Sequence, residues 1–353
     1  MTSAAEVKLS SPDELTIRAE IELGSCMLGT RALLTSHKDA DAFQMAQQCL
    51  DVARKSFVSV GSENKRWQAM VLSTSMAGLV QHASLELDSA AESFESVMSM
   101  LESEKGDRIA LDYLIPEAMK QAASFYCAQG RKERAVSLGM RSITAAEKTL
   151  EMAQNSVDPV LSPRIAELVV ADSKLLMAQS CMYRRSWEEA EEKLGDALRD
   201  VESMAQCSGD PKHPFIAMVL LLLAEVYSRT GRVTLAEGLY RELSKMLSLS
   251  TDSSESGDKG TPLVHPTVIS VMAWRFSQLL TALPQRSTEA DKWRQLASDL
   301  YEEAPMERLT GPEVMFGSLS KLKGKGEYGR GVVLDLMTRR ALPCAKDSDT
   351  FAS

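Results

Sequence analysis

Apolar and small residues recur along the chain at helical spacing, in paired stretches separated by short polar turns. In residues 213–243, HPFIAMVLLLLAEVYSRTGRVTLAEGLYREL, large apolar residues repeat every three or four positions and small residues stand beside them. Such spacing gathers the apolar side chains on one helical face. The stretch therefore predicts two packed helices, one from Pro214 to about Arg229 and one from about Thr234, with Gly231 in the turn.

The paired pattern recurs along the chain with a long period. A small residue is expected early in each second helix, and successive alanines of this kind stand 45 to 55 residues apart. Prolines suited to the first position of each first helix recur 46 to 52 residues apart. These two periodicities predict a stack of helical hairpins. The alanines are Ala42, Ala90, Ala135, Ala190, Ala236 and Ala290, and the prolines are Pro116, Pro163, Pro214, Pro266 and Pro312.

The paired unit resembles a known helical repeat. A Leu-Ala-x2-Tyr element ends at Tyr227 and an Ala-x3-Tyr element begins at Ala236, which is similar to the Leu-Gly-x2-Tyr and Ala-x3-Phe elements of the tetratricopeptide repeat. The long period and the His-Pro pairs at His213 and His265 resemble the kinesin light chain subtype. The resemblance implies an all-α, right-handed superhelical α-solenoid. Nothing in the sequence resembles the heptad stalk by which such light chains join a motor, so motor binding is not expected.

The array is expected to span most of the chain. Residues 16–340 would form about six to seven repeats, preceded by a flexible N-terminus at 1–15 and followed by a flexible tail at 341–353. Residues 248–262 are rich in Ser, Asp and Gly, a composition that predicts a disordered insertion.

The glycine-rich segment near the end has the spacing of a dinucleotide-binding fingerprint, Gly324-x-Gly326-x2-Gly329. That fingerprint must follow a strand and open a helix, whereas this segment follows a helix-like stretch. We therefore expect a degenerate seventh repeat, which Pro312 would open and in which Gly331 would take the small position of the second helix. An array that ends poorly exposes an apolar edge and would favour self-association.

The net charge and the composition limit the kinds of partner and the cellular compartment that we expect. The net charge of −9 disfavours nucleic acids and anionic membranes, and the longest apolar run, ten residues, is too short to span a bilayer, so membrane insertion is not expected. Six scattered cysteines without a Cys-x2-Cys pair indicate reduced thiols and a cytoplasmic protein. A targeting segment upstream of the given sequence would instead direct it to a mitochondrion or plastid.

Catalytic chemistry finds no support in the sequence. The four histidines show no His-x3-His spacing, and those at 213 and 265 precede helix-opening prolines, where a structural role is expected. Without a nucleophile–base pair, a metal-ligand set or a phosphate loop, we expect a non-enzyme that needs no cofactor. The 19 methionines leave two interpretations open, core filling and a Met-lined binding surface.

The resemblance implies a concave groove, formed mainly by the first helices of the repeats, that binds a protein or peptide partner. We expect the chain to be a non-catalytic interaction scaffold or adaptor; the alternatives are a kinesin-light-chain-like cargo adaptor and a regulatory subunit of an enzyme complex. Because Lys120 is the only lysine among the groove positions and none is asparagine, the acidic tails of heat-shock chaperones should not bind. The groove candidates are Lys120, Ser124, Asp172, Gln179, Tyr183, Leu221, Glu225 and Arg229.

Overall fold

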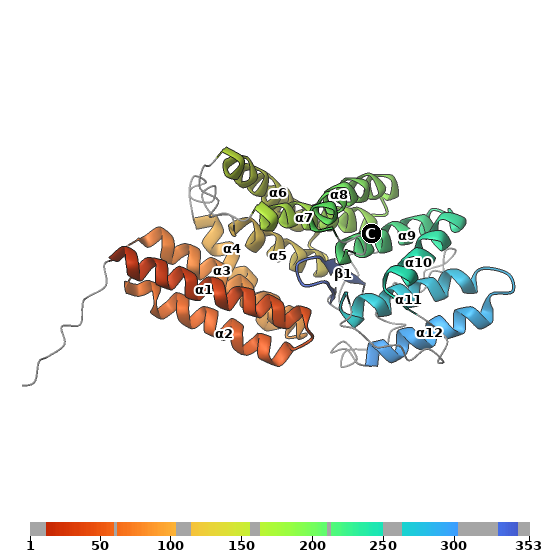
Figure 1. Ribbon diagram of the computed structural model, residues 1–353, viewed down its shortest axis with the longest axis horizontal. Coiled ribbons are helices and arrows are strands. Elements are labelled where there is room, and N and C mark those ends of the chain that lie inside the picture. Colours follow the sequence, from red (N-terminus) through yellow and green to blue (C-terminus); the bar gives the residue numbers. More distant parts are fainter. Residues whose placement is uncertain are drawn as a thin grey trace, which may run out of the picture.

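The computed structural model describes residues 12–59, 62–103, 114–155, 163–209, 213–249, 263–302 and 331–344. Within them, helices follow one another as six packed pairs, which confirms the expected all-α array of helical hairpins (Figure 1). A short 3-10 turn at Phe57–Ser59 follows the first pair. The helices are α1 Pro12–Thr35, α2 Asp39–Lys55, α3 Glu63–Ala83, α4 Leu87–Ser103, α5 Ile115–Ala128, α6 Lys132–Asn155, α7 Pro163–Tyr183, α8 Trp187–Ser208, α9 Pro214–Arg229, α10 Val233–Met246, α11 Pro266–Thr281 and α12 Ser287–Glu302.

The periodic residues occupy the positions that the sequence indicates. All six repeat alanines are at most 1% exposed, as expected of small residues at positions where helices pack closely. The ring nitrogens of His213 and His265 cap α9 and α11 by accepting hydrogen bonds from backbone N–H groups two residues later, at 3.4 and 3.2 Å. Gly231 has φ +77°, as its turn position requires. Helix α10 begins at Val233, one residue before the expected start.

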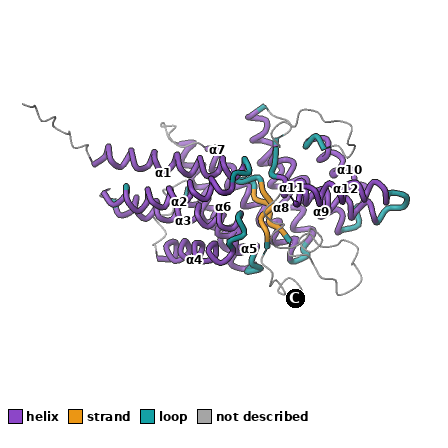
Figure 2. The backbone as a smooth tube through the Cα atoms, turned by 90° about the horizontal axis from the view of Figure 1, so that it is seen from below, coloured by secondary structure: helices purple, strands orange, loops and turns teal. Residues whose placement is uncertain are grey.

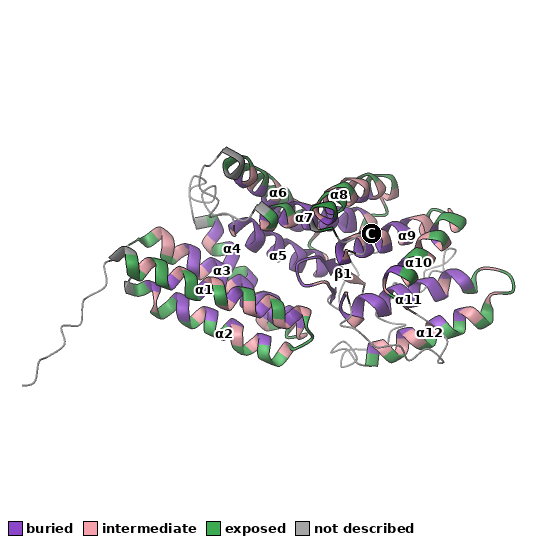
Figure 3. Cartoon of the chain, in the orientation of Figure 1, coloured by how far each residue is buried: buried purple, intermediate pink, exposed green. Residues whose placement is uncertain are grey.

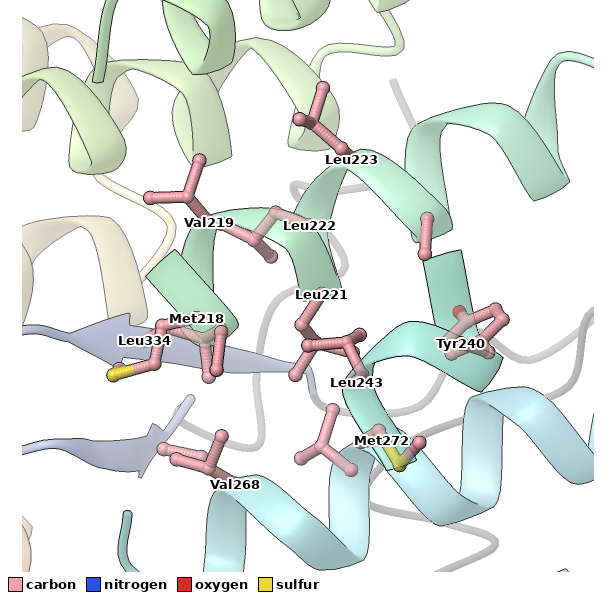
Figure 4. Close-up of a cluster of buried hydrophobic side chains, with 14 of the residues drawn as sticks. Met218, Val219, Leu221, Leu222, Leu223, Tyr240, Leu243, Val268, Met272 and Leu334 are labelled. Carbon is pink, nitrogen blue, oxygen red and sulfur yellow. The ribbon is translucent and has the colours of Figure 1, made fainter. Parts of the chain in front are cut away.

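The hydrophobic core runs between the paired helices. Figure 4 shows Leu221 of α9 beside Leu243 of α10, with Met272 of α11 close by. Figure 3 shows that the buried face of each helix is turned toward its neighbours. The three methionines of the repeat pattern, Met119, Met177 and Met218, are buried, so they fill the core.

The array curves until its two ends meet. Figure 1 shows α1 and α2 on one side of the molecule and α11 and α12 on the other. His37, in the turn after α1, stacks on His265 at the start of α11 with 4.1 Å between ring centroids. The first and last described helical pairs are therefore in direct contact.

A β-hairpin fills the space that the curved array encloses. Strands β1 (Val332–Asp335) and β2 (Arg340–Pro343) pair antiparallel, with Val332 opposite Pro343 and Asp335 opposite Arg340. Figure 2 shows the hairpin between the helices of the two halves. The two larger of the three hydrophobic clusters found in the described residues include hairpin side chains, so the hairpin joins these two.

The hairpin corrects the expectation for the end of the chain. Gly331 does not belong to a second helix; it has φ +80° and leads into β1. Residues 341–344, expected in a flexible tail, are buried. The β-branched pair Val332–Val333 favours an extended strand, and Asp335 fixes the following turn by accepting hydrogen bonds from the amide (2.9 Å) and hydroxyl of Thr338.

The expected boundaries of the array and its terminal segments can be compared with the structure only in part. Residues 12–15, assigned to the flexible N-terminus, form the first turn of α1. Pro312 and the glycines at 324–329 lie outside the described residues, as do residues 1–11, 250–262 and 345–353.

Candidate functional site

One face of α7 binds the backbone of β1. Gln179 uses both ends of its amide, accepting from the N–H of Leu334 at 2.7 Å and donating to its carbonyl at 3.0 Å. One turn later, the Tyr183 hydroxyl donates to the carbonyl of Val332 at 2.6 Å. Earlier on the same face, Asp172 accepts from the N–H of Leu336 at 3.0 Å. These contacts recognise an extended backbone and do not depend on the side chains of the strand.

Two further helices bind the backbone of β2. The ring of His82, on α3, is hydrogen-bonded through Nε2 to the carbonyl of Pro343 at 3.0 Å. Thr267, on α11, accepts from the N–H of Ala341 at 3.2 Å. Burial lowers the pKa of His82, which keeps its ring neutral near pH 7. Helices far apart in the sequence thus hold the two strands of one hairpin.

A buried group of three charges anchors the hairpin tip. Lys120, on α5, forms ion pairs with Asp172 on α7 and Asp335 at the end of β1, and all three side chains are at most 1% exposed. Burial opposes the charge on Lys120, but attraction to the two carboxylates outweighs it and raises the lysine pKa. Burial raises the pKa of Asp172 to about 7. The pKa of Asp335 is lowered, because Lys120 overcomes the effect of burial there.

A second charged contact ties the hairpin to the first helical pair. The guanidinium of Arg340 pairs with Asp39 at the start of α2, and its Nε donates to the carbonyl of Leu34 at 2.9 Å. The backbone N–H of His265 donates to the carbonyl of Arg339 at 3.0 Å. The hairpin therefore contacts both ends of the array at the place where they meet.

The structure brings together four of the eight groove candidates. Lys120, Asp172, Gln179 and Tyr183 all contact the hairpin. Ser124 is buried on α5, and its hydroxyl has no hydrogen-bond partner.

The remaining candidates lie elsewhere. Leu221 packs in the core and is 2% exposed, so its assignment to the groove surface is wrong. Glu225 and Arg229 lie together on α9, where the carboxylate pairs with Arg229 at 3.5 Å and with Arg275 of α11 at 3.3 Å.

Several site residues had no signal in the repeat pattern. Asp39 and His82 look like ordinary helix residues in the sequence. Asp335 and Arg340 belong to the segment VVLDLMTRRALP, whose β-branched start, central Asp and final Pro are typical of a short hairpin. The helical period, extended to Gly331, predicts a helix in the same segment, and this prediction is the wrong one of the two.

Across the seven described ranges, no group of three His, Cys, Asp or Glu side chains is placed to hold a metal ion. Among the helices of the same ranges, none combines the length and the apolar character needed to cross a membrane.

The fold is shared with solved helical-repeat proteins, although no protein-family model and no curated relative matches the sequence. The Rap conjugation gene regulator of plasmid pLS20, solved with the Phr* peptide, matches over 84% of this chain and 76% of its own at 14% identity, with a TM-score of 0.50. BtubC (BKLC) from P. vanneervenii matches over 80% and 97% at 15% identity, with a TM-score of 0.49. The Podosopora anserina putative kinesin light chain TPR-like repeats match over 67% and 97% at 15% identity, with a TM-score of 0.36.

Proposed function

We propose that this chain, which has a TPR-like helical-repeat fold, is a non-catalytic interaction scaffold whose concave groove binds an extended protein segment. The C-terminal hairpin occupies that groove, and a partner segment would take its place. The observation that carries this proposal is the way the hairpin is held: Gln179, Tyr183 and Asp172 bind its backbone. Main-chain hydrogen bonds of this kind give affinity for any extended segment, and side-chain contacts add selectivity.

Selectivity would come from the two charged contacts. Lys120 selects a carboxylate at the position of Asp335, and Asp39 selects a guanidinium at the position of Arg340. A partner segment would therefore carry an acidic residue followed, after a short turn, by an arginine. The Lys120 contact is buried and the Asp39 contact is partly buried, and an unmatched charge is costly there, so segments without these two residues would be disfavoured.

Competition between the hairpin and a partner can be measured with the full-length chain. In the variant Asp335→Ala/Arg340→Ala the hairpin loses both charged contacts while the groove keeps Lys120 and Asp39. A fluorescent peptide of residues 331–344 should bind this variant in trans, and should bind the unchanged chain more weakly. Fluorescence anisotropy measures both affinities, with the doubly substituted peptide as a matched control.

The same peptide then tests partner binding. Proteins captured by the loosened variant should be released by the native peptide and not by the substituted one. Arg199→Ala, at a side chain that is 74% exposed, controls for unrelated charge effects. If the native peptide binds the variant no better than the substituted peptide does, the proposal fails.

A further inference from the structure

Two arginines share one glutamate in the part of the groove formed by α9 and α11. The carboxylate of Glu225 lies 3.5 Å from a terminal nitrogen of Arg229 and 3.3 Å from one of Arg275. The three side chains are only 10–16% exposed. Guanidinium groups stay charged in proteins. Two positive charges and one negative charge therefore occupy this partly buried place.

The guanidinium groups have unused donors. The Nε atoms of Arg229 and Arg275 are both buried and have no hydrogen-bond partner. A terminal nitrogen of Arg275 reaches Gln278 only at 3.5 Å. Arginine binds a carboxylate most strongly side by side, with two parallel N–H donors. Neither arginine makes such a contact with Glu225, since each is joined to it by one long contact to the same oxygen.

Electrostatics agree with the geometry. Burial lowers the pKa of Arg229, and the neighbouring charge of Arg275 lowers it further. The buried hydroxyl of Tyr240 lies within the same group, where burial and the nearby Glu225 raise its pKa. An additional negative charge would relieve the repulsion between the two guanidinium groups and would satisfy donors that now have no acceptor.

Glu225, which the two arginines share, lies near a tyrosine that contacts the hairpin. Glu225 lies close enough to Tyr183 to add to the effect of burial in raising the tyrosine pKa. The hydroxyl of Tyr183 in turn donates to Val332, the first residue of β1. The carboxylate that the two arginines share therefore lies near a side chain that holds β1.

We propose that Arg229 and Arg275 bind a carboxylate side chain of a protein segment lying in the groove beside β1. This inference rests on the proposed function and adds a second acidic residue to the segment. Glu225 already neutralises one of the two guanidinium charges, so one positive charge remains to be matched. A singly charged carboxylate matches it, whereas a doubly charged phosphate would leave excess negative charge in a poorly solvated place.

Arginine side-chain NMR on the full-length chain tests the site directly. Selective ¹⁵Nε labelling reports on the two Nε–H groups, and the variants Arg229→Lys and Arg275→Lys assign their signals. The probe is acetyl-Gly-Glu-Gly-amide, with acetyl-Gly-Gln-Gly-amide as the neutral match and inorganic phosphate at equal ionic strength as the third ligand. The hairpin keeps its sequence throughout, so hairpin displacement is not needed for a positive result.

The glutamate probe should shift the Nε–H signals of Arg229 and Arg275, and the glutamine probe should not. Either lysine variant, which keeps the charge but lacks Nε–H, should weaken the glutamate probe about tenfold. Arg241→Lys, at an arginine paired with Glu237 on its own helix and with Glu289 on α12, should leave its affinity unchanged.

Two outcomes would overturn this assignment: equal shifts with both peptides, or tighter binding of phosphate than of the glutamate probe. A negative result would leave the hairpin competition experiment intact. Conversely, a shift at these two arginines without any binding of the 331–344 peptide would support the carboxylate site and contradict the proposed groove function.

Discussion

Replacing Lys120 with methionine should destabilise the protein strongly, because it removes the only cation of a buried group of three charges. Asp172 and Asp335 would remain at 0% and 1% exposure without their partner. Breaking a buried pair by removing one partner costs about 3–5 kcal/mol. We expect a loss of this size in the free energy of unfolding at pH 7.5, measured by chemical denaturation with tryptophan fluorescence.

The loss should depend on pH in a defined direction. In the native protein the pKa of Asp335 is lowered by Lys120, so this carboxyl stabilises the fold above its unfolded pKa. Without Lys120, burial alone acts on it and raises its pKa, so the folded variant takes up a proton as the pH falls. A carboxyl that is protonated in the folded state and ionised in the unfolded state changes the free energy of unfolding by about 1.4 kcal/mol per pH unit. The difference between the two proteins should therefore be at least about 1.4 kcal/mol smaller at pH 5 than at pH 7.5.

A charge-neutral triple variant provides the control. Lys120→Met/Asp172→Asn/Asp335→Asn removes all three charges, and each asparagine can still accept one backbone hydrogen bond. We expect it to recover most of the lost stability and to flatten the pH dependence, since buried charges that are removed together cost little. A loss below about 1 kcal/mol for Lys120→Met, or a loss independent of pH, would refute the reasoning.

Four further substitutions test other parts of the structure. Gly78→Ala places a Cβ 3.1 Å from an aromatic ring and should cost about 1–3 kcal/mol, whereas Gly24→Ala meets nothing within 4 Å and should be neutral or stabilising in thermal unfolding. Arg340→Ala removes the contact with Asp39 and should speed hydrogen exchange in β2 and the α1–α2 turn while leaving α12 unchanged; uniform exchange rates would contradict this. His265→Asn keeps a capping side chain but removes a ring whose pKa burial lowers to about 2. Below pH 6.5 this histidine takes up a proton in the unfolded chain but not in the folded one, so the native chain loses stability as the pH falls. The variant should lose less, as measured by urea denaturation.

Most of the helical array could be predicted from the sequence because its constraints are local and repeated. Close helix packing requires small residues, so Ala90, Ala190 and Ala236 mark the helical pairs through their spacing. Capping is also local, and the His-Pro pairs at His213 and His265 identify two helix starts correctly. These features depend on neighbours a few residues away, which is why the pattern alone identifies them.

The contents of the groove could not be predicted in the same way. The contact between Lys120 and Asp335 joins residues 215 positions apart, and no periodicity relates them. Lys120 and Gln179 contact the hairpin in the structure, and the helical pattern could not show that the chain itself covers them. The helical period, extended into residues 331–344, predicts a helix there. The local sequence favours a hairpin instead, because Val332 and Val333 favour a strand and Pro343 is typical of a strand end.

Hydrogen–deuterium exchange of residues 331–344 in the unmodified chain tests the central claim most directly. The N–H groups of Leu334, Leu336 and Ala341 donate to side chains of α7 and α11. If the hairpin fills the groove, the peptide covering it should be protected as strongly as the inner helices α5 and α7. Exchange at the rate of an unprotected peptide, with α5 and α7 still protected, would show that the groove is open and would contradict the account.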